Sequence, residues 1–198
     1  MADRNSEMDK LMHAIHMSDK FSFDQAALAV SVAFAKNSDE YRAVSGFYQN
    51  TRAQRSQVPL MNHINEGLVI LGRLGASQNA MKAYCLHPLF QNDRELNSVG
   101  ELYVTSLGES YTTQLAMEYR RVANAYLAKC KMPEGGIQLS PLKEVNDMLI
   151  ADKVQNRKDF LRYHFDTHPN SDRLNQYFIE WLEALNVLER YEELVKGL

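Results

Sequence analysis

Three side chains in this sequence have the chemistry of metal ligands. His63 stands at the start of a predicted helix, His87 at the end of the next, and Asp152 inside a third. Imidazole nitrogens and a carboxylate oxygen from three helices suit a divalent ion such as manganese, iron or zinc. Since the three residues lie far apart along the chain, the prediction requires a fold that brings their helices together.

Asp152 interrupts an apolar helical stripe. The stripe follows the i, i+4, i+7, i+11 spacing of a buried helix face and consists of Val145, Leu149, Asp152 and Asn156. A carboxylate that leaves water must be compensated by a cation, a metal or several donors, or else take up a proton. Two interpretations stay open. Asp152 belongs to a functional site, or it forms a structural ion pair with an arginine, such as Arg120 or Arg121, or with a lysine.

The elements that must position these residues are all predicted to be helices. No stretch alternates polar and apolar residues for long, whereas apolar residues recur at helical spacing. We expect Asn62 to cap one helix, Gly75 to end it, and Pro88 to stop the next one at His87. The predicted helices cover residues 7–17, 23–36, 63–74, 78–86, 111–129, 141–160 and 172–196.

The composition fits one globular domain over residues 1–198, with residues 1–20 as an N-terminal helical appendage. Hydrophobic residues make up 45% of the chain, enough for a sizeable core. The formal net charge of -3 gives no basic field for a nucleic-acid backbone, so no nucleic acid is expected as a partner. Neither an apolar leader nor a run of membrane-spanning length is present, so we expect a cytoplasmic protein with no membrane partner. Cys85 and Cys130 form no metal pattern, and Cys85 is expected to be buried.

Four short motifs carry a resemblance to a known family. Residues 58–63 (VPLMNH), with the run GLVIL at 67–71, resemble the TPYINHP…VA-IL segment of the RelA/SpoT-type hydrolase domains. Residues 83–87 resemble the family's A-x-LLHD, and residues 149–156 resemble its KLADKLYN. Residues 176–181 resemble the EYF-W of small single-domain alarmone hydrolases. The motifs occur in family order, so the region 58–182 resembles the hydrolase core.

The resemblance implies an all-α fold, the helical bundle of HD-domain phosphohydrolases. Members of that family use a bound manganese ion (Mn2+) to remove the 3′-pyrophosphate from guanosine tetra- or pentaphosphate. The resemblance implies that His63, His87 and Asp152 match three of the four metal ligands. The cofactor expected from it is therefore Mn2+ or another divalent metal.

The same resemblance implies a nucleotide partner, namely a guanosine polyphosphate or a related compound. Asn156 and Tyr177 match residues that line the nucleotide pocket, and Arg55 stands near a basic residue that approaches the substrate. Lys153 joins Arg55 and Asn156 as a candidate phosphate contact, because cations and amides are suitable donors to phosphate oxygens.

The sequence departs from the family pattern after the second histidine. The family reads H-D-x-x-E-D, whereas this chain has Pro88 in place of the metal-binding Asp and Gln91-Asn92 in place of Glu-Asp. Proline offers no side-chain ligand, and an amide can orient a water molecule but cannot take its proton. Asp93 would replace the lost acid if the backbone shifted by one residue. The candidate catalytic residues are Gln91, Asn92 and Asp93.

Three hypotheses follow from these residues. The first is a metal-dependent phosphohydrolase that acts on a nucleotide. The second is a catalytically inactive HD-like module that binds a nucleotide or a partner protein, motivated by the lost carboxylates. The third is a purely structural helical protein in which Asp152 pairs with an arginine and the two histidines lie apart. A homo-oligomer is compatible with each of them.

Other charged groups receive a structural interpretation. The histidine pairs His13–His16 and His164–His168 are interpreted as solvated side chains, although their spacing would allow metal binding on a helix. The consecutive arginines at 120 and 121 are expected to pair with acidic neighbours on adjacent helices.

Overall fold

The computed structural model describes residues 24–100 and 110–198 of the chain. Helices are the only regular elements in these ranges, apart from one isolated bridge between Arg52 and Pro59, so the all-α prediction is confirmed. A first helix covers 24–36. The following elements are α2 (Asp39–Tyr48), α3 (Met61–Arg73), α4 (Gln78–Phe90), α5 (Asp93–Glu95), the π-helix η1 (Leu96–Gly100), α7 (Tyr111–Ala125), α8 (Lys143–Tyr163), α9 (Ser171–Ala184), the 3-10 helix η2 (Leu188–Arg190) and α10 (Tyr191–Val195).

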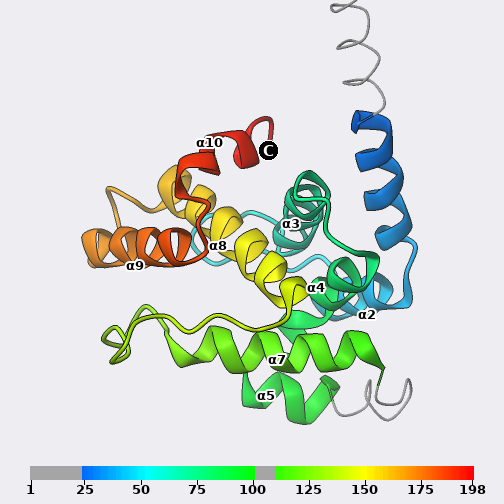
Figure 1. Cartoon of the computed structure of the whole chain (residues 1–198), viewed down its shortest axis with the longest axis horizontal. Helices are drawn as coiled ribbons and strands as arrows, with labels where there is room; N and C mark the ends of the chain where they lie inside the picture. Colours follow the sequence, from blue (N-terminus) through cyan, green and yellow to red (C-terminus); the bar gives the residue numbers. More distant parts are fainter. Residues whose placement is uncertain (1–23, 101–109) are drawn as a thin grey trace, which may run out of the picture.

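Helix α8 lies at the centre of the fold. It contacts α3, α4, α7, α9 and α10, and Figure 1 shows it crossing the molecule between these helices. Every residue from Asp147 to Gln155 is buried, which means that this part of the helix is covered on all sides. Polar side chains in this segment therefore have to find their partners inside the protein.

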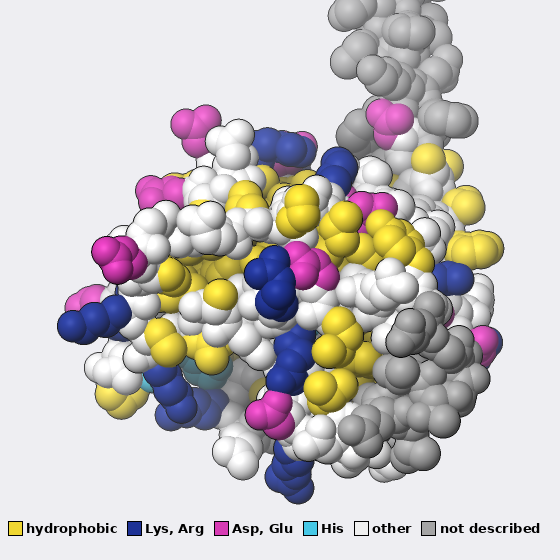
Figure 2. All heavy atoms as spheres, turned by 60° about the horizontal axis from the view of Figure 1, so that its bottom comes forward, with side chains coloured by type: hydrophobic (Ala, Val, Ile, Leu, Met, Phe, Trp, Pro, Cys, Tyr) yellow, Lys and Arg dark blue, Asp and Glu magenta, His cyan; other side chains and the backbone are white. Residues whose placement is uncertain are grey.

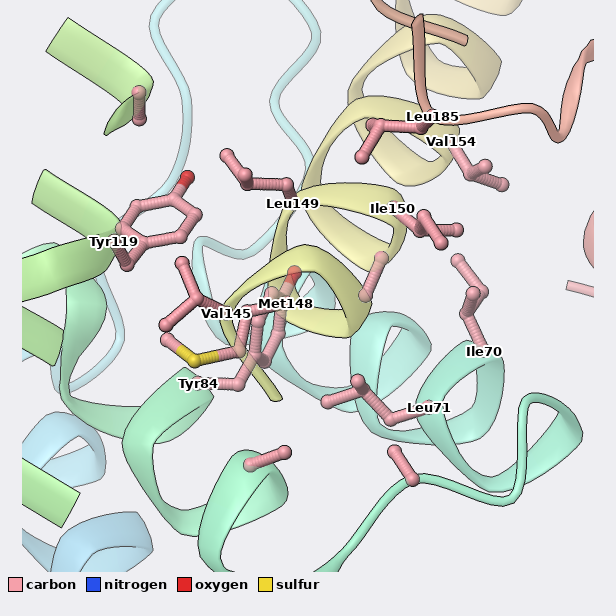
Figure 3. Close-up of a cluster of buried hydrophobic side chains, with 14 of the residues drawn as sticks. Ile70, Leu71, Tyr84, Tyr119, Val145, Met148, Leu149, Ile150, Val154 and Leu185 are labelled. Carbon is pink, nitrogen blue, oxygen red and sulfur yellow. The ribbon is translucent and has the colours of Figure 1, made fainter. Parts of the chain in front are cut away.

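The apolar core surrounds α8. Figure 3 shows side chains of α3, α4, α7 and α8 packed together. The labelled members are Ile70, Leu71, Tyr84, Tyr119, Val145, Met148, Leu149, Ile150, Val154 and Leu185, and all of them are buried. Cys85 also lies in this core, as predicted, and burial raises the pKa of its thiol. The packing holds α3 and α4 against one side of α8.

Several helix ends follow from local residues. The hydroxyls of Ser38, Ser77 and Ser110 accept hydrogen bonds from backbone N–H groups in the first turns of α2, α4 and α7. Gly75 follows α3 with φ of +65°, as predicted for the residue that ends a helix in the left-handed region. The prediction for Asn62 is wrong, because α3 already begins at Met61 and its N-cap makes no side-chain bond.

The prediction that α4 stops at His87 is also wrong. The helix continues through Pro88 to Phe90. Leu86, Leu89 and Phe90 are fully buried in a second apolar cluster, and this burial outweighs the loss of one helical hydrogen bond. Because Pro88 has no N–H, the carbonyl of Tyr84, four residues earlier, is released from the helical ladder.

Other predicted boundaries moved or divided. The predicted helix 172–196 is divided into α9, η2 and α10, with Asn186 in the left-handed region at φ of 55°. The predicted 111–129 helix ends at Ala125, and the predicted 141–160 helix spans Lys143–Tyr163. The predicted 7–17 helix, the 1–20 appendage and the pair His13–His16 lie outside the described residues.

The surface carries charges of both signs. On the face seen in Figure 2, basic, acidic and hydrophobic side chains are interspersed and neither sign of charge dominates. Within the ranges 24–100 and 110–198, none of the helices has the length and apolar character needed to cross a membrane.

The contact between α3 and α4 gives a stability prediction. A Cβ added at Gly67 would overlap the hydroxyl and ring of Tyr84, whereas one added at Gly46 on α2 would meet nothing within 4 Å. We expect Gly67→Ala to lower the free energy of unfolding by about 1–3 kcal/mol through overpacking. Gly46→Ala, the matched control, should raise it by about 0.5–1 kcal/mol through helix propensity. Urea denaturation measures both, and equal effects at the two positions would contradict the described packing.

Candidate metal and ligand site

The three predicted ligands meet at one point in the fold. His63 lies in the first turn of α3, His87 near the end of α4, and Asp152 in the middle of α8. The two Nε2 atoms are 3.1 Å apart. Asp152 Oδ1 lies 3.5 Å from Nε2 of His63 and 3.9 Å from Nε2 of His87. The expectation of the third hypothesis that the two histidines lie apart is therefore wrong.

The imidazole of His87 is held by the main chain of its own helix. Its Nδ1 lies 2.6 Å from the carbonyl oxygen of Tyr84, the carbonyl that Pro88 releases from the helical ladder. A carbonyl can only accept, so Nδ1 carries the proton and Nε2 presents a lone pair. Burial, and then the neighbouring His63, lower the pKa of His87 to about 3, although Asp152 opposes this effect. His87 is therefore a neutral imidazole at neutral pH.

The imidazole of His63 is held from the opposite side. Its Nδ1 lies 2.6 Å from Oε1 of Gln155 on α8. Its Nε2 faces His87 and Asp152, and the Tyr84 hydroxyl lies 3.3 Å from it. Both histidines thus use Nδ1 for a structural contact and direct Nε2 towards the same point.

Asp152 is buried as an ion pair with the residue that follows it. Lys153 Nζ lies 2.8 Å from Oδ2, and Asn156 Nδ2 donates to Oδ1 at 2.8 Å. Burial alone would raise the pKa of Asp152, but Lys153 and the two imidazoles outweigh it and hold the pKa well below its usual range. Burial would likewise lower the pKa of Lys153, and Asp152 reverses this shift. Both groups are therefore charged inside the protein.

Of the structural ion pairs considered for Asp152, the pair with a lysine is found, and the pair with Arg120 or Arg121 is wrong. Arg120 forms its ion pair with Asp93, and Arg121 forms one with Glu118 on the same helix. The expectation that these arginines have acidic partners is confirmed. For Arg121 the partner lies on its own helix rather than on an adjacent one.

Besides its ion pair with Asp152, Lys153 contacts two aromatic rings. Its Nζ lies over the rings of Tyr177 and Trp181, at 5.6 and 5.1 Å from their centroids.

The donor atoms of His63, His87 and Asp152 can hold a metal ion. They lie within 4.8 Å of one another. A tetrahedral ion with bonds of about 2.1 Å separates its ligands by about 3.4 Å, which is close to the spacing found here. The hydroxyl of Tyr119, whose ring lies 5.1 Å from that of His87, is buried without a hydrogen-bond partner among the described residues. A ligand or water at the centre would satisfy this hydroxyl.

A cavity of about 590 Å³ opens next to the three ligands. It has room for a ligand the size of a nucleotide. All four residues predicted to contact a nucleotide line this cavity, and so does one of the three candidate catalytic residues; these are Arg55, Lys153, Asn156, Tyr177 and Gln91. Pro88 is also part of the wall.

The other two candidate catalytic residues lie elsewhere. Asn92 accepts a hydrogen bond from the N–H of Glu95 and so caps α5. Asp93 is largely exposed and paired with Arg120. Neither residue belongs to the cavity lining, so the shift of register that would bring Asp93 into the site is not found.

Sequence reasoning missed several residues of the site. Gln155 contacts His63, and Tyr48 lines the cavity. His164 and His168, interpreted above as solvated, are only partly exposed and also belong to the lining. The missed signal was the concentration of polar residues at 152, 153, 155 and 156 directly after the apolar run 148–151, which indicates a polar network rather than a single buried acid.

Comparison with known proteins adds no relative. No protein-family model, curated protein or solved structure matches this chain significantly. The interpretation of the site therefore depends on its own geometry.

The buried ion pair predicts unequal effects of two similar substitutions on α8. Lys153→Met leaves the Asp152 charge buried without its cation, and we expect a loss of about 3–5 kcal/mol in the free energy of unfolding in EDTA. Lys143, the control, pairs with Asp147 but its side chain is 74% exposed. Lys143→Met should cost less than about 1 kcal/mol. Equal losses in chemical denaturation would show that Asp152 does not depend on Lys153.

His87 gives a prediction for the pH dependence of stability. The folded protein binds a proton at His87 only near pH 3, whereas the unfolded chain binds one below its ordinary pKa of about 6.5. The free energy of unfolding should therefore fall with decreasing pH, by about 1.4 kcal/mol per pH unit from this group between about pH 6 and 4. His87→Gln should remove this part of the slope. Urea denaturation of both proteins in EDTA from pH 7 to 4 measures it, and parallel slopes would refute it.

Proposed function

We propose that this chain is an HD-phosphohydrolase-like protein, in which His63, His87 and Asp152 bind a divalent metal and the adjacent cavity binds a phosphorylated nucleotide. The ligand class expected from the motif resemblance is a guanosine polyphosphate. One observation carries the proposal, namely the convergence of two imidazole Nε2 atoms and one carboxylate oxygen within 3.9 Å.

The convergence is unfavourable without a cation. Nδ1 of each ring lies 2.6 Å from an oxygen, so two neutral imidazoles would direct the lone pairs of both Nε2 atoms towards Asp152 Oδ1, which is an acceptor as well. Asn156 Nδ2 donates to Asp152 Oδ1, and the Tyr84 hydroxyl lies 3.3 Å from His63 Nε2, which leaves His87 Nε2 without a donor among the described residues. A shared proton is a poor substitute, because burial and His63 lower the pKa of His87 to about 3. A divalent ion would satisfy all three atoms together.

The cavity offers suitable contacts for an anionic nucleotide. Arg55, on its wall, forms no ion pair with any described residue and is available to a phosphate group. Asn156 can offer an amide, and Tyr177 an aromatic ring for a base or sugar. A divalent ion bound at the triad would neutralise phosphate charge and activate a water molecule for attack.

A second candidate function is nucleotide binding without turnover. It is favoured by the position of Gln91, an amide at the place where the family has the glutamate of its Glu-Asp pair. The carboxylate of Asp159 also lines the cavity, but Gln155 and Lys158 already contact it. A group engaged in this way is a weak proton acceptor for an attacking water.

Metal binding and turnover can be tested separately. We expect the purified protein to bind about one Mn2+ per chain in calorimetry, and His63→Ala, His87→Ala or Asp152→Ala to abolish binding. Guanosine tetraphosphate should bind only with Mn2+ present, and Arg55→Ala should weaken that binding about tenfold through loss of one charged hydrogen bond. Arg52→Ala, in the same loop but outside the cavity lining, is the control. Absence of metal binding by the wild-type protein would refute the proposal.

Phosphate release then separates the two functions. Hydrolysis that depends on Mn2+ and is lost in His87→Ala supports an enzyme. Tight binding without release supports a binding module, and in that case the triple variant Pro88→Asp, Gln91→Glu, Asn92→Asp should gain hydrolysis if only the lost acids prevent it.

A further inference from the structure

A ring of polar residues lies behind His63, on the side away from the metal ligands. Gln155 Nε2 lies 2.8 Å from Oδ2 of Asp159 and 3.1 Å from Oε2 of Glu66. Lys158 Nζ contacts both carboxylates, at 2.6 Å from Glu66 and 3.0 Å from Asp159. Glu66 is one turn after His63 on α3, and the other three residues are on α8, so the ring joins the two helices.

The ring fixes the orientation of the Gln155 amide. Two carboxylates can only accept hydrogen bonds, so the NH2 group of the amide must face Glu66 and Asp159. The amide oxygen must then face His63, where it lies 2.6 Å from Nδ1. Rotation by 180° would place the oxygen against two carboxylates and the NH2 group against the imidazole. Gln155 is buried, so water cannot compensate for such a rotation.

An amide oxygen that can only accept determines the tautomer of the neutral imidazole. The proton of His63 must be on Nδ1, and the lone pair of Nε2 must point towards Asp152 and His87. We propose that Gln155 is a positioning residue of the metal centre, oriented by Glu66 and Asp159, which holds His63 in the tautomer that binds a metal. This inference rests on the proposed function. It adds a residue that acts through His63 and need not contact the metal or the nucleotide itself.

The arrangement differs from the support of His87. His87 is held by a main-chain carbonyl, whose orientation does not depend on another side chain. His63 is held by one side chain, which itself depends on the charges of two others. The metal affinity of the centre should therefore be sensitive to substitutions behind His63, although none of those side chains contacts the ion.

The tautomer can be read without any metal. In 15N NMR spectra of the metal-free protein, we expect His63 and His87 each to carry the proton on Nδ1. Gln155→Leu should convert His63 to a mixture of tautomers and leave His87 unchanged. Gln114→Leu, an exposed position on α7, should change neither. A wild-type His63 that lacks a proton on Nδ1, or a tautomer unaffected by Gln155→Leu, would overturn the inference.

The affinity for Mn2+ gives the second measurement. Gln155→Leu should weaken calorimetric Mn2+ binding about 10–100-fold, the usual effect of removing a partner of a ligating histidine. Gln155→Glu alone places a third carboxylate against Glu66 and Asp159 and should also bind Mn2+ weakly. Adding Glu66→Gln restores a donor opposite the introduced carboxylate and keeps the total charge, so the double variant should recover affinity to within a few-fold of wild type.

The outcomes separate this inference from the proposed function. If the wild-type protein binds Mn2+ and Gln155→Leu binds it equally well, the positioning role is refuted and the metal centre stands. If the wild-type protein binds no Mn2+, the proposed function fails, and the tautomer spectra still decide whether Gln155 orients His63. Should Gln155→Leu fail to fold, the positioning role is still tested by the wild-type tautomer and by the Mn2+ affinity of the double variant Gln155→Glu, Glu66→Gln.

Discussion

The structure depends on a negative charge that is kept inside its central helix. Asp152 is 2% exposed and remains ionised because Lys153 lies against Oδ2 and Asn156 donates a hydrogen bond to Oδ1. Each of these partners must be held in place by packing, since a buried charge tolerates little displacement. The apolar contacts of α8 with α3, α4 and α9 can therefore be understood as the framework that keeps this charge and its partners together.

The sequence was sufficient to predict the helical class and the meeting of His63, His87 and Asp152. An acid on an apolar stripe is costly, so its presence there indicated that partners would come to it. The expected kinds of partner included a lysine, but which residue would supply the charge could not be predicted. Consecutive residues point in different directions on a helix, which is why Lys153 was assigned to phosphate rather than to Asp152. Gln155 was missed because amides carry no charge and are common on helix surfaces.

Pro88 shows a different limit of local rules. Its ring and missing N–H predict a helix end, and the burial of Leu89 and Phe90 overrides that preference. The same missing N–H leaves the Tyr84 carbonyl to His87 Nδ1. Pro88 offers no metal ligand where the motif of the similar family has an aspartate. It nevertheless supports the orientation of the neighbouring His87 imidazole. An aspartate at this position would introduce a competing N–H donor.

The pairing of Asp152 with its neighbour has a consequence for which ions the centre would prefer. Lys153 lies against Oδ2, so Oδ1 is the carboxylate oxygen that faces the two histidines, and the other two predicted ligand atoms are nitrogens. Calcium favours six to eight oxygen ligands and often a carboxylate that binds through both oxygens, and magnesium likewise favours oxygen. A site with two imidazoles and a single carboxylate oxygen instead discriminates in favour of first-row transition metals and zinc, even where the alkaline-earth ions are far more abundant.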